Sequence, residues 1–217
     1  MPVVEIVSVN VGLPREVAWR GRTIRTGIFK APVAGSLHAR TTGLEGDGQA
    51  DLSVHGGRDK AVYGYPAEHY PWWREALPGA ELPWGAFGEN LTTGGLLEEA
   101  VHIGDRYRAG SAELVVTQPR TPCFKLGLRH DRPGLVKQLL RSGRCGFYFA
   151  VLSEGAVAAG DRIEPVALDG QRISIADCVR LARGEGDSDL LRAAAGHPAL
   201  AEVWQAQLRE ALARRRG

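Results

Sequence analysis

The sequence predicts a mainly β protein with peripheral helices, followed by a small helical unit at the C-terminus. The first observation is a series of short apolar or alternating segments through residues 3–166, separated by glycine-rich turns. The second is a pair of similar fragments, residues 103–107 and 159–163, each a Gly-Asp turn leading into a strand. The third is a change to helical periodicity after residue 168. Many short strands joined by glycine turns are typical of a barrel or a sandwich.

The predicted strands are rich in β-branched and aromatic residues or alternate between polar and apolar side chains. They are residues 3–9, 17–20, 23–29, 37–41, 61–65, 87–92, 106–108, 113–117, 147–152 and 162–166. Two helices are predicted between them, at residues 67–77 and 133–141. We therefore assign residues 1–167 to one β domain.

Residues 168–217 are predicted to form a compact unit of three helices. Ser174, with Asp177 three residues later, is a typical helix start. Residues 187–195 predict a second helix, and residues 198–215 predict a third with an apolar stripe. So small a unit rarely folds alone, so we expect it to dock on the β domain.

The composition excludes a disordered chain and a membrane-spanning helix. Hydrophobic residues make up 44% and charged residues 24% of the 217 residues, as in ordinary globular domains. No apolar run approaches the roughly 20 residues that cross a bilayer, and the chain does not begin like a secretory signal. A net charge of +2 is too small to indicate nucleic acid. With only three cysteines, we expect a cytoplasmic protein without membrane or stable nucleic-acid binding.

A glycine-rich polar segment covers residues 46–60. His55, Gly56 and Gly57 can expose consecutive backbone N–H groups as an anion nest, and Lys60 adds positive charge. Taken alone, such a segment is more often a glycine-rich turn with solvated charges. It is not a Walker loop, because the Gly-Lys-Ser/Thr sequence is missing.

A second polar segment follows at Gly88-Glu89-Asn90. Gly88 allows an unusual backbone angle, so Glu89 and Asn90 can point polar groups into a cleft. The simpler interpretation of these residues alone is a turn that leads into a strand.

The most informative segment surrounds Cys123. Pro119 and Pro122 restrict the backbone before it, so the thiol is presented from a rigid loop. Arg120 and Lys125 flank the cysteine, and nearby cations favour the thiolate, which is the nucleophile and the soft metal ligand. Free cysteines are often simply buried. A core cysteine does not usually need two prolines and two cations around it, so we favour a functional role.

The other two cysteines are interpreted as structural. Cys145 leads into an apolar strand, and the preceding Arg144 is a possible anion contact. Cys178 lies in a predicted helix. The charge composition adds one hint, because 23 of the 27 basic residues are arginine and only four are lysine. Three of these lysines, Lys30, Lys60 and Lys125, lie in segments singled out here or in the family motifs below.

These motifs together resemble MOSC-domain proteins, named after the C-terminal domain of molybdenum cofactor sulfurases. The series is Gly27-Ile28-Phe29-Lys30, then Gly46-Asp47, Gln49-Ala50-Asp51, His55-Gly56-Gly57 and Lys60-Ala61, then Gly85-Ala86-Phe87-Gly88-Glu89-Asn90-Leu91, and finally Gln118-Pro119-Arg120, Pro122-Cys123 and Lys125-Leu126. The resemblance spans almost the whole chain. It is strongest to standalone bacterial members linked to resistance to 6-N-hydroxylaminopurine, which also carry a small C-terminal helical unit.

The resemblance implies a fold, a cofactor and an activity. The fold would be a MOSC-type β-barrel over residues 1–167 with the three-helix unit after it. The cofactor would be a molybdopterin-type molybdenum cofactor. The activity would be reduction of small N-hydroxylated substrates such as 6-N-hydroxylaminopurine, a detoxification, with electrons from a separate reductase.

The resemblance also assigns site residues. Cys123 falls where related proteins place the thiolate that ligates molybdenum. The cofactor's phosphate needs cations and backbone donors, and N–O cleavage needs a general acid, for which His55 and Glu89 are candidates. The residues expected to bind the cofactor are Lys30, Gly56, Gly57, Lys60, Asn90, Arg120, Lys125 and Arg144.

Two alternatives remain open at this stage. The first is a non-catalytic carrier that holds the cofactor, or a sulfurated form of it, for another protein. The second is a thiol-dependent binding or redox protein without molybdenum, in which Cys123 acts as a sensor. Turnover of a hydroxylamino substrate argues against the first, and the pterin content of the purified protein tests the second.

Overall fold

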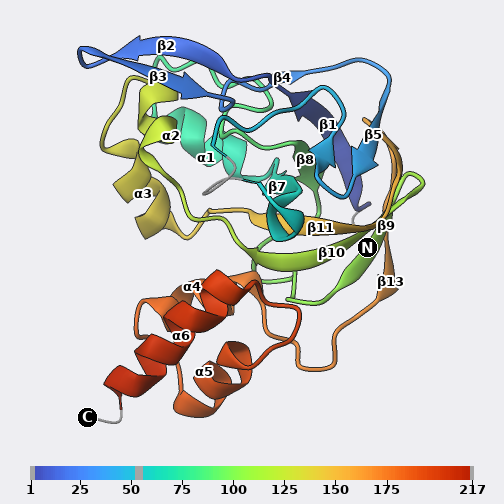
Figure 1. The fold of residues 1–217 in the computed structure, drawn as a ribbon, viewed down its shortest axis with the longest axis vertical. Helices are drawn as coiled ribbons and strands as arrows, with labels where there is room; N and C mark the ends of the chain where they lie inside the picture. Colours follow the sequence, from blue (N-terminus) through green and yellow to red (C-terminus); the bar gives the residue numbers. More distant parts are fainter. Residues whose placement is uncertain (1–2, 52–55, 216–217) are drawn as a thin grey trace.

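A computed structural model describes residues 3–51 and 56–215 of the chain. Within these residues the strands form one eight-stranded sheet, one three-stranded sheet and a two-stranded hairpin (Figure 1). In spatial order the large sheet contains β13 (Ile163–Ala167), β9 (Arg106–Ala109), β10 (Ala112–Pro119), β11 (Phe147–Ser153), β7 (Val62–Pro66), β8 (Leu91–Gly94), β1 (Glu5–Val11) and β4 (Ala31–Pro32). The three-stranded sheet contains β12 (Gly155–Ala158), β5 (Ser36–Arg40) and β6 (Gly43–Leu44), and the hairpin contains β2 (Arg15–Trp19) and β3 (Arg22–Thr26). The prediction of a mainly β protein is confirmed.

The barrel that the resemblance implied is not confirmed, because no closed barrel is found among the described residues. The strand order of the large sheet is open, with β13 and β4 as its outer strands. The two ends of the sheet meet only briefly, where an isolated bridge joins Glu5 of β1 to Arg162 just before β13. At the other end of β1 the same edge pairs with β4, Asn10 lying opposite Pro32. A ring of strands does not form because β1 meets β13 only where each strand begins.

The helices between the strands lie beside the large sheet (Figure 1). They are α1 (His69–Ala76), α2 (Phe124–Arg129) and α3 (Leu135–Ser142), with a short 3-10 helix, η1 (Arg58–Lys60). The helices predicted at residues 67–77 and 133–141 are confirmed as α1 and α3. The sequence did not predict α2, which begins directly after Cys123. None of the helices in the described part of the chain has the length and apolar character needed to cross a bilayer.

An aromatic cluster joins α1 to the sheet. Tyr65, Tyr70, Trp73 and Phe87 are all fully buried. The rings of Tyr65 and Phe87 stack with their centroids 4.7 Å apart, and the Trp73 indole N–H donates to the Tyr65 hydroxyl at 2.5 Å. Such aromatic groups bury large apolar areas, so this cluster holds in place the loop of residues 85–90 that leads into β8.

The C-terminal segment contains α4 (Ile175–Ala182), α5 (Ser188–Ala195) and α6 (Glu202–Arg214), which lie together beside β10 (Figure 1). The predicted helix start at Ser174 is confirmed as a capping box. The Ser174 hydroxyl accepts from the Asp177 N–H, and the Asp177 carboxylate accepts from the Ser174 N–H. The division into two folding units at residue 168 stays a prediction.

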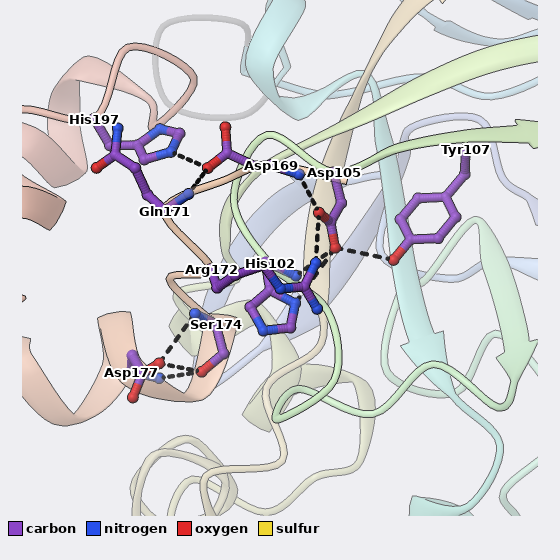
Figure 2. A network of polar contacts seen from close by, with 9 residues as sticks. All are labelled: His102, Asp105, Tyr107, Asp169, Gln171, Arg172, Ser174, Asp177 and His197. Atoms are coloured by element: carbon purple, nitrogen blue, oxygen red, sulfur yellow. Dashed lines mark hydrogen bonds and ion pairs between the residues drawn. The ribbon is translucent and has the colours of Figure 1, made fainter. Parts of the chain in front are cut away.

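A polar network joins the segment before α4 to the large sheet (Figure 2). Its centre is Asp105, which is fully buried before β9. One carboxylate oxygen accepts from the Asp169 N–H at 2.8 Å and lies 3.3 Å from the Arg172 guanidinium. The Asp169 side chain in turn contacts the His197 ring at 3.1 Å. The network therefore ties the C-terminal helices to the β strands through partly buried hydrogen bonds.

Candidate functional site

A pocket lies where the ends of three strands and several loops meet. Strand pairing places Tyr63 of β7 opposite Tyr148 of β11, and Tyr148 opposite Gln118 of β10. Both tyrosines line the pocket. The loop segments that contribute further lining residues are 26–30, 48–50, 56–60, 88–90 and 120–125. These are the polar and glycine-rich segments that the sequence singled out, so the fold brings them together.

Cys123 lines this pocket from the start of α2. It is the N-cap residue of the helix, has an extended backbone, and its carbonyl accepts from the Leu126 N–H at 3.0 Å. Pro119 ends β10, and Pro122 is buried next to the cysteine. The side chain of Cys123 is partly exposed. The structure thus places Cys123 at the pocket, and the rigid presentation of its thiol stays a prediction.

Arg120 is the buried cation of the pocket. It is 6% exposed, and its guanidinium lies over the Tyr63 ring at 5.2 Å from the centroid. One terminal nitrogen makes a long bond of 3.4 Å to the Phe87 carbonyl, and the other, Nη1, is buried without a hydrogen-bond partner. Burial lowers the pKa of Arg120, but Tyr63, Tyr148 and Cys123 around it outweigh this effect and raise the pKa above its usual value. Arg120 is therefore a permanent charge with a donor left to offer.

Lys30 reaches the same pocket, but its charge is compensated. Its ammonium contacts both carboxylate oxygens of Asp47. Asp47 also accepts from the Gly12 N–H at 3.0 Å and from the Asn90 side-chain amide at 2.9 Å. Asn90 lines the pocket as expected. Lys30, Asp47 and Asn90 thus form one buried unit that joins three loops of the pocket wall.

The other residues expected to bind the cofactor or to act as the acid lie at different places. Gly56, Lys60 and Lys125 line the pocket. Gly57 lines a neighbouring groove. His55 lies outside the described residues, so its expected role as a general acid stays a prediction.

Glu89 is not among the lining residues. It is fully buried, and its carboxylate accepts from the Gly85 N–H at 2.8 Å, the Phe87 N–H at 3.0 Å, the Thr92 hydroxyl at 3.0 Å and the Tyr70 hydroxyl. Burial raises the pKa of Glu89, and these hydrogen bonds oppose the rise. The expectation that Glu89 is the general acid does not agree with this placement, because the carboxylate holds its own loop instead of facing the pocket.

Arg144 also lies away from the pocket. Its guanidinium covers the Trp72 ring at 4.5 Å from the centroid and lines a separate groove beside α4. The expected contact with the cofactor therefore does not agree with the structure. An arginine stacked on an indole is well satisfied by cation–π attraction.

Sequence reasoning missed Asp47 as the partner of Lys30 and missed the two tyrosines of the pocket floor. Tyr63 and Tyr148 lie in segments that were interpreted only as strands. Their register across β7 and β11 makes them neighbours. No local signal reveals this, since pairing between distant strands decides it.

The exposure of the three thiols leads to a labelling prediction. Burial raises the pKa of Cys145 and raises that of Cys178 to about 12, so both stay protonated and inaccessible at neutral pH. Brief treatment of the native protein with a maleimide should therefore label Cys123 alone, as read by mass spectrometry. Cys123→Ala should remain unlabelled until the protein is denatured. Rapid labelling of a second thiol in the native protein would contradict this assignment.

Comparison with known proteins now identifies the family. A family model described as the MOSC domain matches residues 51–164, which include the Cys123 loop. This chain belongs to the MOSC domain family. The matched region contains β7 to β12 of the structure, and the pocket is completed by segments that precede it.

Three known proteins or structures are similar to this chain. "Uncharacterized protein YflK" of Bacillus subtilis is 41% identical over 202 residues, covering 93% of this chain and 91% of that protein. The crystal structure of YiiM from Geobacillus stearothermophilus superposes with a TM-score of 0.80 at 35% identity, covering 96% of this chain and 99% of that one. A protein named "Reductase" from Gibberella moniliformis is 38% identical over 186 residues, which cover 84% of this chain but 33% of that longer protein.

Proposed function

We propose that this protein binds a molybdopterin-type molybdenum cofactor in the pocket at Cys123 and reduces N-hydroxylated substrates such as 6-N-hydroxylaminopurine. A separate reductase would supply the electrons. The observation that carries the proposal is the presence of a partly exposed thiol and a buried, incompletely bonded guanidinium in one pocket. Membership of the MOSC family and the relative named "Reductase" support the same class of activity.

The residues present fit such a cofactor. Nη1 of Arg120 is buried without a partner, so a ligand oxygen placed against it would complete its hydrogen bonding. The described residues contain no cluster of three or more histidine, cysteine or acidic side chains that could hold a metal ion by themselves. A metal that brings its own sulfur ligands needs only one further soft ligand, and the Cys123 thiolate suits that position.

Each pocket residue then has a definite task. Cys123 would ligate the metal through Sγ. Arg120 would donate to an anionic oxygen of the cofactor in a charge-assisted bond, and Lys60 and Lys125 would add positive charge at the wall. Asn90 would hold the pocket wall in place, because its amide nitrogen donates to Asp47 at 2.9 Å and its oxygen accepts from the Tyr63 N–H at 3.1 Å. When bound, the cofactor supplies a metal that changes oxidation state during reduction.

Loss of the thiol is expected to remove most of the molybdenum. The protein is produced in cells that make molybdopterin, and the molybdenum and pterin contents are measured for wild type, Cys123→Ala and the control Cys178→Ala. Cys178 is buried in α4, so the control makes the same chemical change away from the pocket. We expect Cys123→Ala to lose molybdenum and the control to keep it. Equal molybdenum contents in wild type and Cys123→Ala would remove Cys123 as an essential ligand.

Turnover separates an enzyme from a carrier. The loaded wild-type protein receives a reductant and a hydroxylamino substrate, and formation of the amine is followed by chromatography. We expect the amine to form with wild type and with Cys178→Ala, and to fall to background with Cys123→Ala. A loaded wild-type protein that never produces the amine would instead be a carrier, and protein that never acquires pterin would contradict the cofactor itself.

A further inference from the structure

Reduction of an N–O bond needs protons as well as electrons, so a group at the pocket must be able to give up a proton. Arg120 is a poor acid, because its raised pKa keeps the proton in place. Tyr63 and Tyr148 are also poor acids, because burial raises the pKa of both hydroxyls. Among the described residues that line the pocket, the lysines are the better candidates.

Lys30 differs from the other two lysines of the pocket. It is 8% exposed, whereas Lys60 and Lys125 are half-buried. Its ammonium lies against both carboxylate oxygens of Asp47. The two charges form a neutral pair, so Lys30 contributes little net attraction for an anionic cofactor. A buried lysine of this kind suits proton transfer better than binding of a phosphate.

We propose that the Lys30 ammonium donates a proton to the oxygen that departs from the substrate, and that Asp47 positions Lys30 for this step. The inference rests on the proposed reduction of N-hydroxylated substrates. In balanced form, R–NH–OH takes up two electrons from a reduced donor protein and two protons, and yields R–NH₂ and water. The N–O bond breaks as Nζ of Lys30 passes its proton to the oxygen, which leaves as water. The nitrogen takes its proton from solvent, which also reprotonates the neutral Lys30 amine.

The surroundings of Lys30 and Asp47 hold both groups in place. Asp47 accepts from the Gly12 N–H and from the Asn90 amide, and the Asn90 side-chain oxygen accepts from the Tyr63 N–H at 3.1 Å. The Lys30 carbonyl accepts from the Arg129 guanidinium at 3.1 Å. A proton donor fixed at both its main chain and its charged end needs little reorganisation when substrate arrives.

The charges that face Lys30 come from three elements. Burial lowers the pKa of Lys30, while Asp47 from the loop after β6 and Glu89 from the loop before β8 raise it and Arg129 of α2 lowers it. The net result is a pKa below the usual value for lysine. The rate is therefore expected to fall as the pH rises through this lowered pKa, because the acid is then already deprotonated.

Four variants test the assignment by activity. They are Lys30→Arg, Lys30→Met, the double variant Lys30→Met with Asp47→Asn, and the control Lys137→Met, whose lysine lies on α3 in a separate groove. Arginine keeps the ion pair but holds its proton too strongly to donate it. The double variant removes both charges, so no lone carboxylate is left buried. We expect kcat to fall about 10²–10⁴-fold in all three Lys30 variants, with molybdenum and pterin contents retained and the control unchanged.

A second readout does not require turnover. The chain has only four lysines, so spectra of protein labelled at the lysine Nζ and Cε atoms contain few signals, and Lys30→Arg identifies the signal of Lys30. In the cofactor-free protein, we expect Lys30 to titrate below the usual pKa of lysine, because it is buried. Asp47→Asn should lower the titration midpoint of Lys30 further, because the opposite charge is removed.

The pH profile of kcat adds a third test. If Lys30 were only structural, its replacement would leave the pH dependence of kcat the same as in wild type.

The outcomes separate this inference from the proposed function. If wild type neither loads nor turns over, the proposed function fails. If wild type turns over and Lys30→Arg retains its kcat, Lys30 is not the donor. Loss of cofactor from the double variant with normal turnover per bound cofactor would assign Lys30 to binding and overturn the inference. A Lys30 midpoint at or above the usual pKa of lysine would overturn it as well.

Discussion

Replacing Asp105 with alanine is expected to lower the free energy of unfolding by about 3–5 kcal/mol, because one buried donor and three partly buried donors lose their acceptor together. Besides the Asp169 N–H and the Arg172 guanidinium at one oxygen, the other oxygen accepts from the His102 N–H at 3.2 Å and from the Tyr107 hydroxyl at 3.3 Å (Figure 2). Each unsatisfied buried donor costs about 1–3 kcal/mol. The Arg172 side chain is about half exposed, so its ion pair adds little.

Asp105→Asn separates the hydrogen bonds from the shape of the side chain. Asparagine has the same size as aspartate, but its amide nitrogen replaces one of the two carboxylate oxygens. This nitrogen cannot accept a hydrogen bond, so the donors at that position lose their acceptor. We therefore expect Asp105→Asn to lose a large part of the stability that the alanine variant loses. Chemical denaturation measures both variants, and Asp189→Asn is the control, because the Asp189 side chain is 92% exposed and pairs only across one helical turn with Arg192.

Loss of the network is also expected to loosen the C-terminal helices. Asp105 reaches across to Asp169, which precedes α4 and contacts His197 before α6. Limited proteolysis of Asp105→Ala should therefore cut the segment between β13 and α4 earlier than in wild type. An alanine variant that unfolds like wild type and resists protease equally would show that the network does not hold the helices.

The parts of the fold that the sequence predicted are those set by local chemistry. The capping box at Ser174 depends on two residues three positions apart, and α1 depends on a short run with its own periodicity. The loop at Cys123 was singled out because two prolines and two cations surround it within seven residues. In each case the determining residues are neighbours in the chain, so no knowledge of the fold was needed.

The parts that the sequence did not predict depend on contacts between distant segments. Alternating strands and glycine turns are typical of a barrel or a sandwich, and the family resemblance implied a barrel, but closure depends on how β1 meets β13, which begins more than 150 residues later. Glu89 was expected to face the pocket, whereas Tyr70 of α1 and the N–H groups of its own loop hold it inside. Charge alone also did not distinguish Lys30, which is paired, from Arg120, which keeps an unpartnered nitrogen.

Arg120→Met is expected to change protein stability and cofactor binding in opposite directions. The arginine is buried with one long hydrogen bond and one unpartnered nitrogen, so its hydrogen bonding is incomplete in the cofactor-free protein. Methionine has a similar length and no polar atom, so it can fill the space over the Tyr63 ring. We expect the free energy of unfolding of the cofactor-free variant to be unchanged or raised by up to about 2 kcal/mol, as measured by denaturant titration.

The same substitution is expected to weaken retention of the pterin. A charge-assisted bond to a buried anion is worth about 2–4 kcal/mol when one partner is removed, which corresponds to a roughly 30- to 1,000-fold weaker affinity. Pterin content after repeated dialysis measures the loss, and Arg144→Met is the matched control, because Arg144 stacks on Trp72 outside the pocket. If Arg120→Met lost stability yet retained its pterin, Arg120 would be a packing residue. It would then not be the buried cation that holds the proposed cofactor.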